Sequence, residues 1–471
     1  MMMNNKYKTL LGNSALFAIG NLGSKLISFL MLPLYTYQMT SGSFGQADLI
    51  QTTVSLLLPV VSLSIFDAIL RFGMDRSNDR SEIFSNGVLV TLVSSVLVLI
   101  LGGMAEFLGF KFALYLTIIL IMQSIQSLFS QYSKAIGKVQ IFAANGILMS
   151  LVTAFFNVLL LVVFHLGIRG YLLSIVFANL FSNIYLLFRI KLYNEFSVEK
   201  INFQKLKDML RFSAPLIPNS VAWWITNTIS RYFILFFINV KANGIFAVAN
   251  KIPSLISVLD SIFYQSWQIS AVKEYGSENK GQFYSDIFYM YSELLFLGVS
   301  GVLFILRPMM SILVSKEFDT AWKYVPFLLL TVVYSGFSGF LGQYYIAAKK
   351  TTGVFTTTVV GALLNVIFNF IFIPTLGLMG AGVSSALSFA ILWLIRIRDT
   401  QKFVRTKFHI KNMIGNHIII GLQILVMFSL NGSEMYVFNF LFLIISFVLN
   451  RKIVLSTIDM IVNLRPKHRI N

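Results

Sequence analysis

The chain has 471 residues, of which 56% are hydrophobic and only 12% are charged, and it contains no cysteine. A sequence so apolar and so poor in charge is typical of a polypeptide that crosses a lipid bilayer many times. The lack of cysteine excludes disulfides and thiolate metal sites, and the four histidines are scattered without metal-ligand spacing. We therefore expect a multi-pass membrane protein that binds no metal.

About fourteen apolar stretches are each long enough to cross a hydrocarbon core of about 30 Å as a helix. Continuous apolar runs such as Val88–Gly102 exclude the alternating pattern of a transmembrane barrel, so an all-α fold is expected. No small-residue cleavage site follows the first stretch, so it is expected to be a mature helix. The predicted spans are 9–37, 44–72, 83–104, 109–133, 140–164, 168–190, 211–239, 243–272, 283–306, 321–348, 353–374, 378–398, 411–430 and 436–450.

The 37 lysines and arginines give a net charge of +18, and their placement predicts orientation. With both termini in the cytoplasm, 28 of them fall in cytoplasmic segments and six in outer loops, which is the positive-inside pattern. The richest stretches, Arg189–Arg211 and Arg396–Lys411, are then anchors against anionic lipid rather than a nucleic-acid surface. We expect cytoplasmic termini and no nucleic-acid partner.

Short motifs recur along the chain at a spacing of roughly 200–212 residues. The period contains six helices, so both halves would enter the membrane in the same orientation, as in transporters whose substrate site lies between two lobes. We predict an N-terminal six-helix lobe at 1–190, a cytoplasmic linker at 191–210, a second six-helix lobe at 211–398, and two further helices with a basic tail at 399–471. The matched motifs include Gly167–Gly170 with Gly377–Gly380, Gln131-Tyr132 with Gln343-Tyr344, and Phe44-Gly45 with Asn243-Gly244.

The linker contains apolar residues at near-helical spacing, namely Ile201, Phe203, Leu206 and Leu210. Lysines lie between them. The pattern indicates either a short helix on the cytoplasmic membrane surface or an ordinary amphipathic connection.

Three cations, Lys25, Arg231 and Lys251, are predicted to lie deep within spans, where a charge is costly and indicates function. At a rise of about 1.5 Å per residue, Lys25 lies about 18 Å from the outer end of its span, and Arg231 and Lys251 lie about 12 Å deep. Lys25 and Arg231 belong to the opening helix of each half, so the three cations are predicted to line one central cavity that binds an anion. Arg71 either lines the inner mouth of that cavity or extends its side chain to the membrane interface.

The acidic residues inside or bordering the spans are Asp48, Asp67, Asp260 and Glu293, which could pair with the cations or bind a coupling ion. Asp67 lies one helical turn before Arg71, which predicts a local ion pair. Asp260 and Glu293 are the coupling candidates, with H+ or Na+ as the ion. No other cofactor is expected.

Aromatic side chains beside amides indicate sugar binding, because a ring packs on a sugar face while amides bond hydroxyl groups. Trp223 and Trp267 lie near Asn219 and other amides, so we include these three residues among the substrate-binding candidates. Interfacial or core packing is the alternative for the tryptophans. Pro215 and Pro218 predict a bend in the span 211–239.

Enzyme motifs are missing. The sequence has no nucleotide-binding phosphate loop, no H-E-x-x-H and no G-x-S-x-G. The outer loops are short and leave little room for a catalytic domain, so a transporter is expected rather than an enzyme.

Several segments resemble bacterial polysaccharide flippases of the Wzx type, most strongly over 9–75 and 208–275. One difference is Ser230, where similar proteins often have an aspartate before the arginine, so we expect Arg231 to lack that carboxylate partner. The matching segments are Asn13-Ser14-Ala15, Gly20–Lys25, Leu32–Tyr35, Pro215–Asn219 with Trp223-Trp224, Arg231-Tyr232, Asn243–Phe246, Ala249–Pro253 and Gln265-Ser266-Trp267.

The resemblance implies the fold of the multidrug/oligosaccharidyl-lipid/polysaccharide exporters, with two six-helix lobes around a central cavity. It implies an undecaprenyl-diphosphate-linked oligosaccharide as substrate, moved to the outer leaflet of the bacterial cytoplasmic membrane for capsule, exopolysaccharide or O-antigen assembly. The lipid bilayer, a polysaccharide polymerase and a chain-length regulator are the partners it implies. A drug/cation antiporter on the same fold and a membrane-embedded glycan polymerase or ligase stay open as alternatives.

Overall fold

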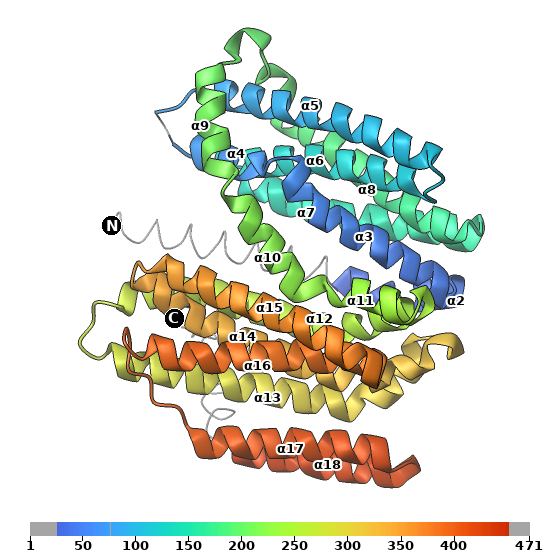
Figure 1. Ribbon diagram of the computed structural model, residues 1–471, viewed down its shortest axis with the longest axis vertical. Coiled ribbons are helices and arrows are strands. Elements are labelled where there is room, and N and C mark those ends of the chain that lie inside the picture. The colour runs from blue at the N-terminus through green and yellow to red at the C-terminus, as the bar shows by residue number, and fades with distance from the viewer. Residues whose placement is uncertain (1–25, 76, 452–471) are drawn as a thin grey trace, which may run out of the picture. The chain divides into compact units, whose positions relative to one another are not determined.

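The computed structural model describes residues 26–75 and 77–451, and every regular element in that part of the chain is a helix (Figure 1). Twelve of these helices are long and apolar enough to cross a membrane. The expected all-α polytopic fold is confirmed, whereas the number of fourteen spans stays a prediction. Of the stretches without one unbroken long helix, 9–37 lies mostly outside the described residues and 211–239 is divided. The chain forms two compact units, Met1–Val248 and Ala249–Asn471.

In the first unit, helices that are neighbours in sequence pack against each other, and α6 and α8 also pack together. Two apolar clusters fill it, one around Ile69 and Phe84 and one around Ile119 and Leu172. Its elements are α2 (Leu32–Gln38), α3 (Ser41–Val61), α4 (Ile65–Gly73), α5 (Arg80–Phe107), α6 (Ala113–Ala135), α7 (Val139–Asn157) continued by the π-helix η1 (Val158–Val163), α8 (Gly167–Ile190), the 3-10 turns η2 (Leu192–Asn194) and η3 (Val198–Lys200), α9 (Phe203–Ser213), α10 (Leu216–Thr228), α11 (Ser230–Phe237) and the start of α12 (Val240–Glu274).

The second predicted span, 44–72, is interrupted between α3 and α4. Pro59 has no amide hydrogen to donate, and α3 ends two residues later. Leu63 and Ser64 then adopt left-handed backbone angles, with φ of 52° and 48°. The backbone amide and the hydroxyl of Ser62 both donate to the Leu58 carbonyl, at 3.1 and 2.7 Å, where the helix ends. The span is therefore two helices with a polar joint.

The linker folds against the first unit. Its predicted amphipathic helix is confirmed as α9, which packs on α4 and α5 (Figure 1). Met209 is fully buried there, and Leu206 and Leu210 pack against the same cluster. Upstream, the Glu195 carboxylate accepts hydrogen bonds from Tyr132 and Ser81 at 2.9 and 3.1 Å. The linker is thus docked by specific contacts, while its place on the membrane surface stays a prediction.

The matched glycines of the two halves lie against each other in the first unit. A Cβ added to Gly244 would overlap the Ser41 carbonyl oxygen, and one added to Gly45 would overlap the Val240 carbonyl oxygen. Only glycine lets the backbones of α3 and α12 approach so closely. This crossing positions the polar side chains of both helices near one another.

The second unit is organised around α14, whose side chains are mostly buried. It packs on α13, α15 and α16, while α17 and α18 pack on each other and on α13. After the remainder of α12, the elements are α13 (Lys280–Leu313), the 3-10 segment η4 (Lys316–Lys323), α14 (Val325–Ala347), α15 (Thr351–Leu376), α16 (Leu378–Thr400), α17 (Ile410–Ser429) and α18 (Gly432–Leu449).

Candidate functional site

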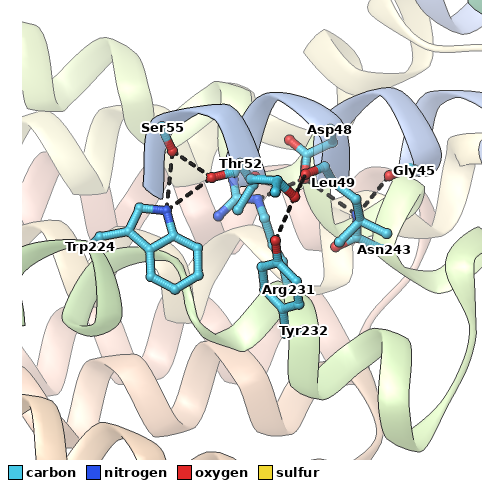
Figure 2. A network of polar contacts seen from close by, with 10 residues as sticks. Gly45, Asp48, Leu49, Thr52, Ser55, Trp224, Arg231, Tyr232 and Asn243 are labelled. Carbon is cyan, nitrogen blue, oxygen red and sulfur yellow. Dashed lines mark hydrogen bonds and ion pairs between the residues drawn. The ribbon is translucent and has the colours of Figure 1, made fainter. Parts of the chain in front are cut away.

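The candidate site lies in the first unit, where the divided seventh span meets α3. Pro215 caps α10, and a second break at Ile229 separates α10 from α11. The predicted bend in this span is therefore confirmed. The break places Arg231 and Tyr232 in the first turn of α11, with their side chains toward α3 (Figure 2).

Arg231 forms an ion pair with Asp48 of α3. Its Nε donates to the Asp48 Oδ2 at 2.7 Å, and the two side chains are only 16% and 18% exposed. Within residues 26–75 and 77–451, neither Nη group of Arg231 donates a hydrogen bond. The position before the arginine is Ser230 and supplies no carboxylate, but Asp48, one of the acids expected to be able to pair with the cations, is the partner from 183 residues earlier.

Asn243 fixes the carboxylate from the other side. Its Nδ2 donates to the Gly45 carbonyl at 3.0 Å and reaches the Asp48 Oδ2 at 3.3 Å (Figure 2). Asn243 is fully buried, and the adjacent Gly244 makes the close backbone approach to α3. The glycine crossing therefore positions the acid that holds the arginine.

Aromatic residues on α10 and α11 extend the contact along α3. The Tyr232 hydroxyl lies 2.6 Å from the Thr53 Oγ1. The Trp224 Nε1 donates to the Thr52 carbonyl and to the Ser55 Oγ, each at 3.1 Å (Figure 2). These bonds hold both pieces of the seventh span against one face of α3.

The other predicted cations differ in their surroundings. Lys25 lies outside the described residues. Lys251 is half-buried on α12 and belongs to the second unit, so the cavity shared by the three cations stays a prediction. Arg71 is exposed in the last turn of α4, and no ion pair joins it to Asp67. That predicted pair is wrong, because Asp67 is half-buried and interacts electrostatically with Lys134 of α6 instead.

The predicted sugar-binding residues differ in exposure. Asn219 and Trp223 are exposed on α10. Trp267 is only 2% exposed and lies in the aromatic core of the second unit, where its ring stacks on Phe340 at 4.1 Å. Its Nε1 donates to the Phe340 carbonyl at 3.1 Å. Core packing, the alternative interpretation, therefore describes Trp267, and its predicted contact with sugar is corrected.

The two coupling candidates are both in the second unit. Asp260 on α12 accepts a hydrogen bond from the Tyr291 hydroxyl of α13. Glu293 is fully buried, and its Oε2 accepts from the Asn416 Nδ2 at 3.1 Å. Its Oε1 has no hydrogen-bond partner among the described residues. Neither Asp260 nor Glu293 forms an ion pair with a basic side chain in the described part of the chain.

Arg396 is a buried cation that the sequence did not reveal. It is only 5% exposed on α16, and all its hydrogen-bond acceptors are neutral. The guanidinium donates to the Thr357 and Thr358 hydroxyls at 3.0 Å each and to the Ser338 carbonyl at 2.8 Å. Its position at the start of the basic stretch Arg396–Lys411 concealed it. The three consecutive threonines 356–358 on α15 were the available signal for a polar partner.

Comparisons with known proteins agree with this fold. The sequence model of the family described as "Polysaccharide biosynthesis protein" matches residues 10–267, more than half of the chain, and that range contains Asp48, Arg231 and Asn243. A curated relative, the probable low-salt glycan biosynthesis flippase Agl15 of Haloferax volcanii, is 24% identical over 216 residues. That alignment covers 45% of this chain and 46% of the relative, so the chain spans about half the length of this relative.

Solved structures show the same architecture at low identity. The lipid II flippase MurJ in an inward closed conformation has a TM-score of 0.72 at 13% identity, covering 95% of this chain and 99% of that one. A MATE transporter in complex with MaL6 has a TM-score of 0.62 at 13% identity, covering 84% and 95%. The fold is thus shared with these membrane transporters. The chain belongs to the polysaccharide biosynthesis protein family.

Proposed function

We propose that this protein flips an undecaprenyl-diphosphate-linked oligosaccharide from the inner to the outer leaflet of a bacterial cytoplasmic membrane. The product would serve capsule, exopolysaccharide or O-antigen assembly, with the expected polymerase and chain-length regulator acting afterwards. The observation that carries the proposal is the arrangement of Arg231. A half-buried guanidinium is held at Nε by one acid, in a family of polysaccharide biosynthesis proteins.

The geometry suits a diphosphate. Asp48 fixes the guanidinium plane through Nε, which leaves the edge that bears the two Nη groups for a bidentate contact with phosphate oxygens. Because Asp48 neutralises part of the charge, Arg231 alone would hold a diphosphate weakly. Lys25 and Lys251 would supply further charge, and the exposed Trp223 and Asn219 would contact the sugars. Arg71 would lie at the inner mouth of the cavity.

An ion gradient would drive the cycle, with H+ or Na+ bound at Asp260 or Glu293. The support is burial. A buried carboxylate without a cation is costly, and protonation or a bound sodium ion removes that cost. Glu293, with an unpartnered Oε1 in the described structure, meets this condition directly.

The proposal is tested by complementation of a bacterial strain that lacks its own flippase for the same glycan. Arg231→Gln should lower surface polysaccharide by about tenfold, since one charge-assisted contact to phosphate is lost. The lipid-linked oligosaccharide should accumulate on the cytoplasmic side of the membrane. Arg231→Lys should retain part of the activity, and Lys241→Gln, which removes an exposed cation from the same unit, should have no effect.

The double variant Lys25→Ala with Arg231→Ala gives the decisive negative outcome. If surface polysaccharide stays normal in that variant, the cationic cavity is not the substrate site. A drug/cation antiporter would leave the lipid-linked oligosaccharide pool unchanged in every variant. A polymerase or ligase would leave single repeat units already exposed at the outer surface.

A further inference from the structure

The second unit contains a cavity of about 810 Å³ at the ends of three helices. It is formed by the last turns of α14 and α16, the first turns of α15 and the residues that follow α16. The basic residues Lys350, Arg398 and Lys402 line it, together with Tyr345, Thr356 and Val360. The positive-inside pattern predicts that this end faces the cytoplasm.

The charge around the cavity is positive and only partly compensated. One acid, Asp399, is among the lining residues, and it accepts hydrogen bonds from Lys402 at 2.6 Å and from the Tyr345 hydroxyl at 2.7 Å. In the part of the chain that the structure describes, no carboxylate lies within ion-pair distance of Lys350 or Arg398. The charges of Lys350 and Arg398 are therefore available to a bound anion.

The buried cation Arg396 adds to the positive charge around the cavity. Thr357 lines the cavity, and its Oγ1 accepts from the Arg396 Nε at 3.0 Å. The contacts of Arg396 are all to hydroxyl and carbonyl groups, so its positive charge has no counter-ion within the described residues. A buried cation without a counter-ion strongly favours an anion nearby, because electrostatic interactions are screened little in a low-dielectric interior.

The lining is amphipathic. Lysine, arginine and threonine side chains occupy part of it, and Val360, Ile395 and Phe403 supply an apolar part. Threonine hydroxyls and basic groups bind phosphate oxygens, whereas a free phosphate has no apolar group to contact Val360, Ile395 and Phe403. A phosphodiester attached to an acyl chain satisfies both.

We propose that this cavity binds an anionic phospholipid, with its phosphate at Lys350 and Arg398 and its acyl chain along Val360 and Ile395. The site is separate from the Arg231 site and does not depend on the proposed flippase activity. It differs from diffuse anchoring by a basic stretch, because Arg405 and Lys407 belong to the same stretch but do not line the cavity. Basic pockets between membrane helices are known places for anionic headgroups.

Native mass spectrometry of the purified full-length protein tests the site, with phosphatidylglycerol and phosphatidylcholine as probes. The wild-type protein should bind phosphatidylglycerol about tenfold more tightly than phosphatidylcholine. Lys350→Gln with Arg398→Gln should remove that preference. The matched control, Arg405→Gln with Lys407→Gln, loses the same charge from exposed positions outside the cavity and should keep it.

Two further variants separate the headgroup from the chain. Val360→Phe fills the apolar part and should weaken phosphatidylglycerol while leaving every charge in place. Lys350→Arg with Arg398→Lys should retain binding, and both variants keep the test valid if the glutamine pair does not fold. An equal loss in the two glutamine pairs would overturn the proposal in favour of diffuse anchoring. Displacement of phosphatidylglycerol by equimolar inorganic phosphate would overturn it in favour of a free phosphate site.

Discussion

Arg231 and Arg396 show two ways in which a membrane protein accommodates an arginine in an apolar helix. Arg231 in the first unit is partly exposed and is held by one carboxylate through Nε. Arg396 in the second unit is almost fully buried and is surrounded by neutral oxygen atoms from α14 and α15. The first arrangement leaves donors for a ligand, and the second uses the guanidinium to join three helices.

The difference follows from the neighbours. Gly342 on α14 leaves room for the Arg396 side chain, since a Cβ there would lie 3.0 Å from its Nη1. The acceptors of Arg396 are backbone carbonyls and threonines in packed helices, so they cannot leave without disrupting the fold. Asp48 is a single side chain, and its contact with Arg231 can be exchanged for another anion. We therefore expect Arg396 to contribute to stability, and we propose ligand binding for Arg231.

The largest effect is expected for Arg396→Met, which keeps the apolar volume of the side chain but removes the donors with which Arg396 joins three packed helices. Its loss should lower the stability of the second unit by about 3 kcal/mol, because buried carbonyl and hydroxyl groups lose hydrogen bonds. The apparent melting temperature in detergent should fall by several degrees. The matched change Arg231→Met should shift it much less, and an equal shift would contradict the comparison.

Gly244→Ala should give the next largest effect. The added methyl group would overlap the Ser41 carbonyl, so α3 and α12 must separate, at a cost of about 2 kcal/mol from overpacking. The separation should also move Asn243 away from Asp48. Gly103→Ala on α5 is the control, because a Cβ there meets no atom within 4 Å. Thermal unfolding of the two variants side by side provides the measurement.

A double-mutant cycle on Asp48 and Arg231 should give a smaller value. The side chains are 16–18% exposed, so a coupling of about 1 kcal/mol is expected, between the values for surface and buried pairs. Asp48→Asn, Arg231→Gln and the double variant define the cycle. Exchanging the two residues should recover much of the stability but not the transport. Recovered transport would show that the pair acts only in folding.

The sequence predicted the local features of the site. The proline pair indicated a bend in the seventh span near Pro215, before α10, and the spacing of apolar residues predicted α9. The depth of Arg231 indicated a functional role, which stays a prediction. The second break, at Ile229, has no proline to indicate it. Such features depend on residues a few positions away, so they can be predicted from the spacing of residues along the chain. The all-α fold follows from the same information.

The sequence could not assign each partner, because the partners come from distant parts of the chain. Asp48 was one of four acids that could pair with the cations, but nothing local singles it out for Arg231, which lies 183 residues later. Trp267 has amide neighbours in sequence but aromatic neighbours in space, so its environment was misjudged. Arg396 lies near the end of the predicted span 378–398 and begins a basic stretch, so it resembled a membrane anchor, whereas its side chain is buried among neighbouring helices.

The exposed pair Asp79–Lys200 extends the comparison to its weakest case. The atoms lie 2.9 Å apart, but the side chains are 50% and 44% exposed, so the pair should contribute less than about 0.5 kcal/mol. Asp79 also caps α5 by accepting from the Ser81 amide at 2.9 Å. Asp79→Asn should therefore keep the cap and change stability little, whereas Asp79→Ala should lose about 1 kcal/mol.

The pH dependence of this pair has a defined sign. The hydrogen bond from Lys200 lowers the pKa of Asp79, so the carboxylate is more readily ionised in the folded protein. Its contribution should be constant at neutral pH and disappear only as the pH falls below about 4, through the lowered pKa. Hydrogen exchange at the start of α5, compared between wild type and Lys200→Gln in low and high salt, measures it. A salt-independent difference as large as that of the Asp48–Arg231 cycle would mean that burial does not set the strength of these pairs.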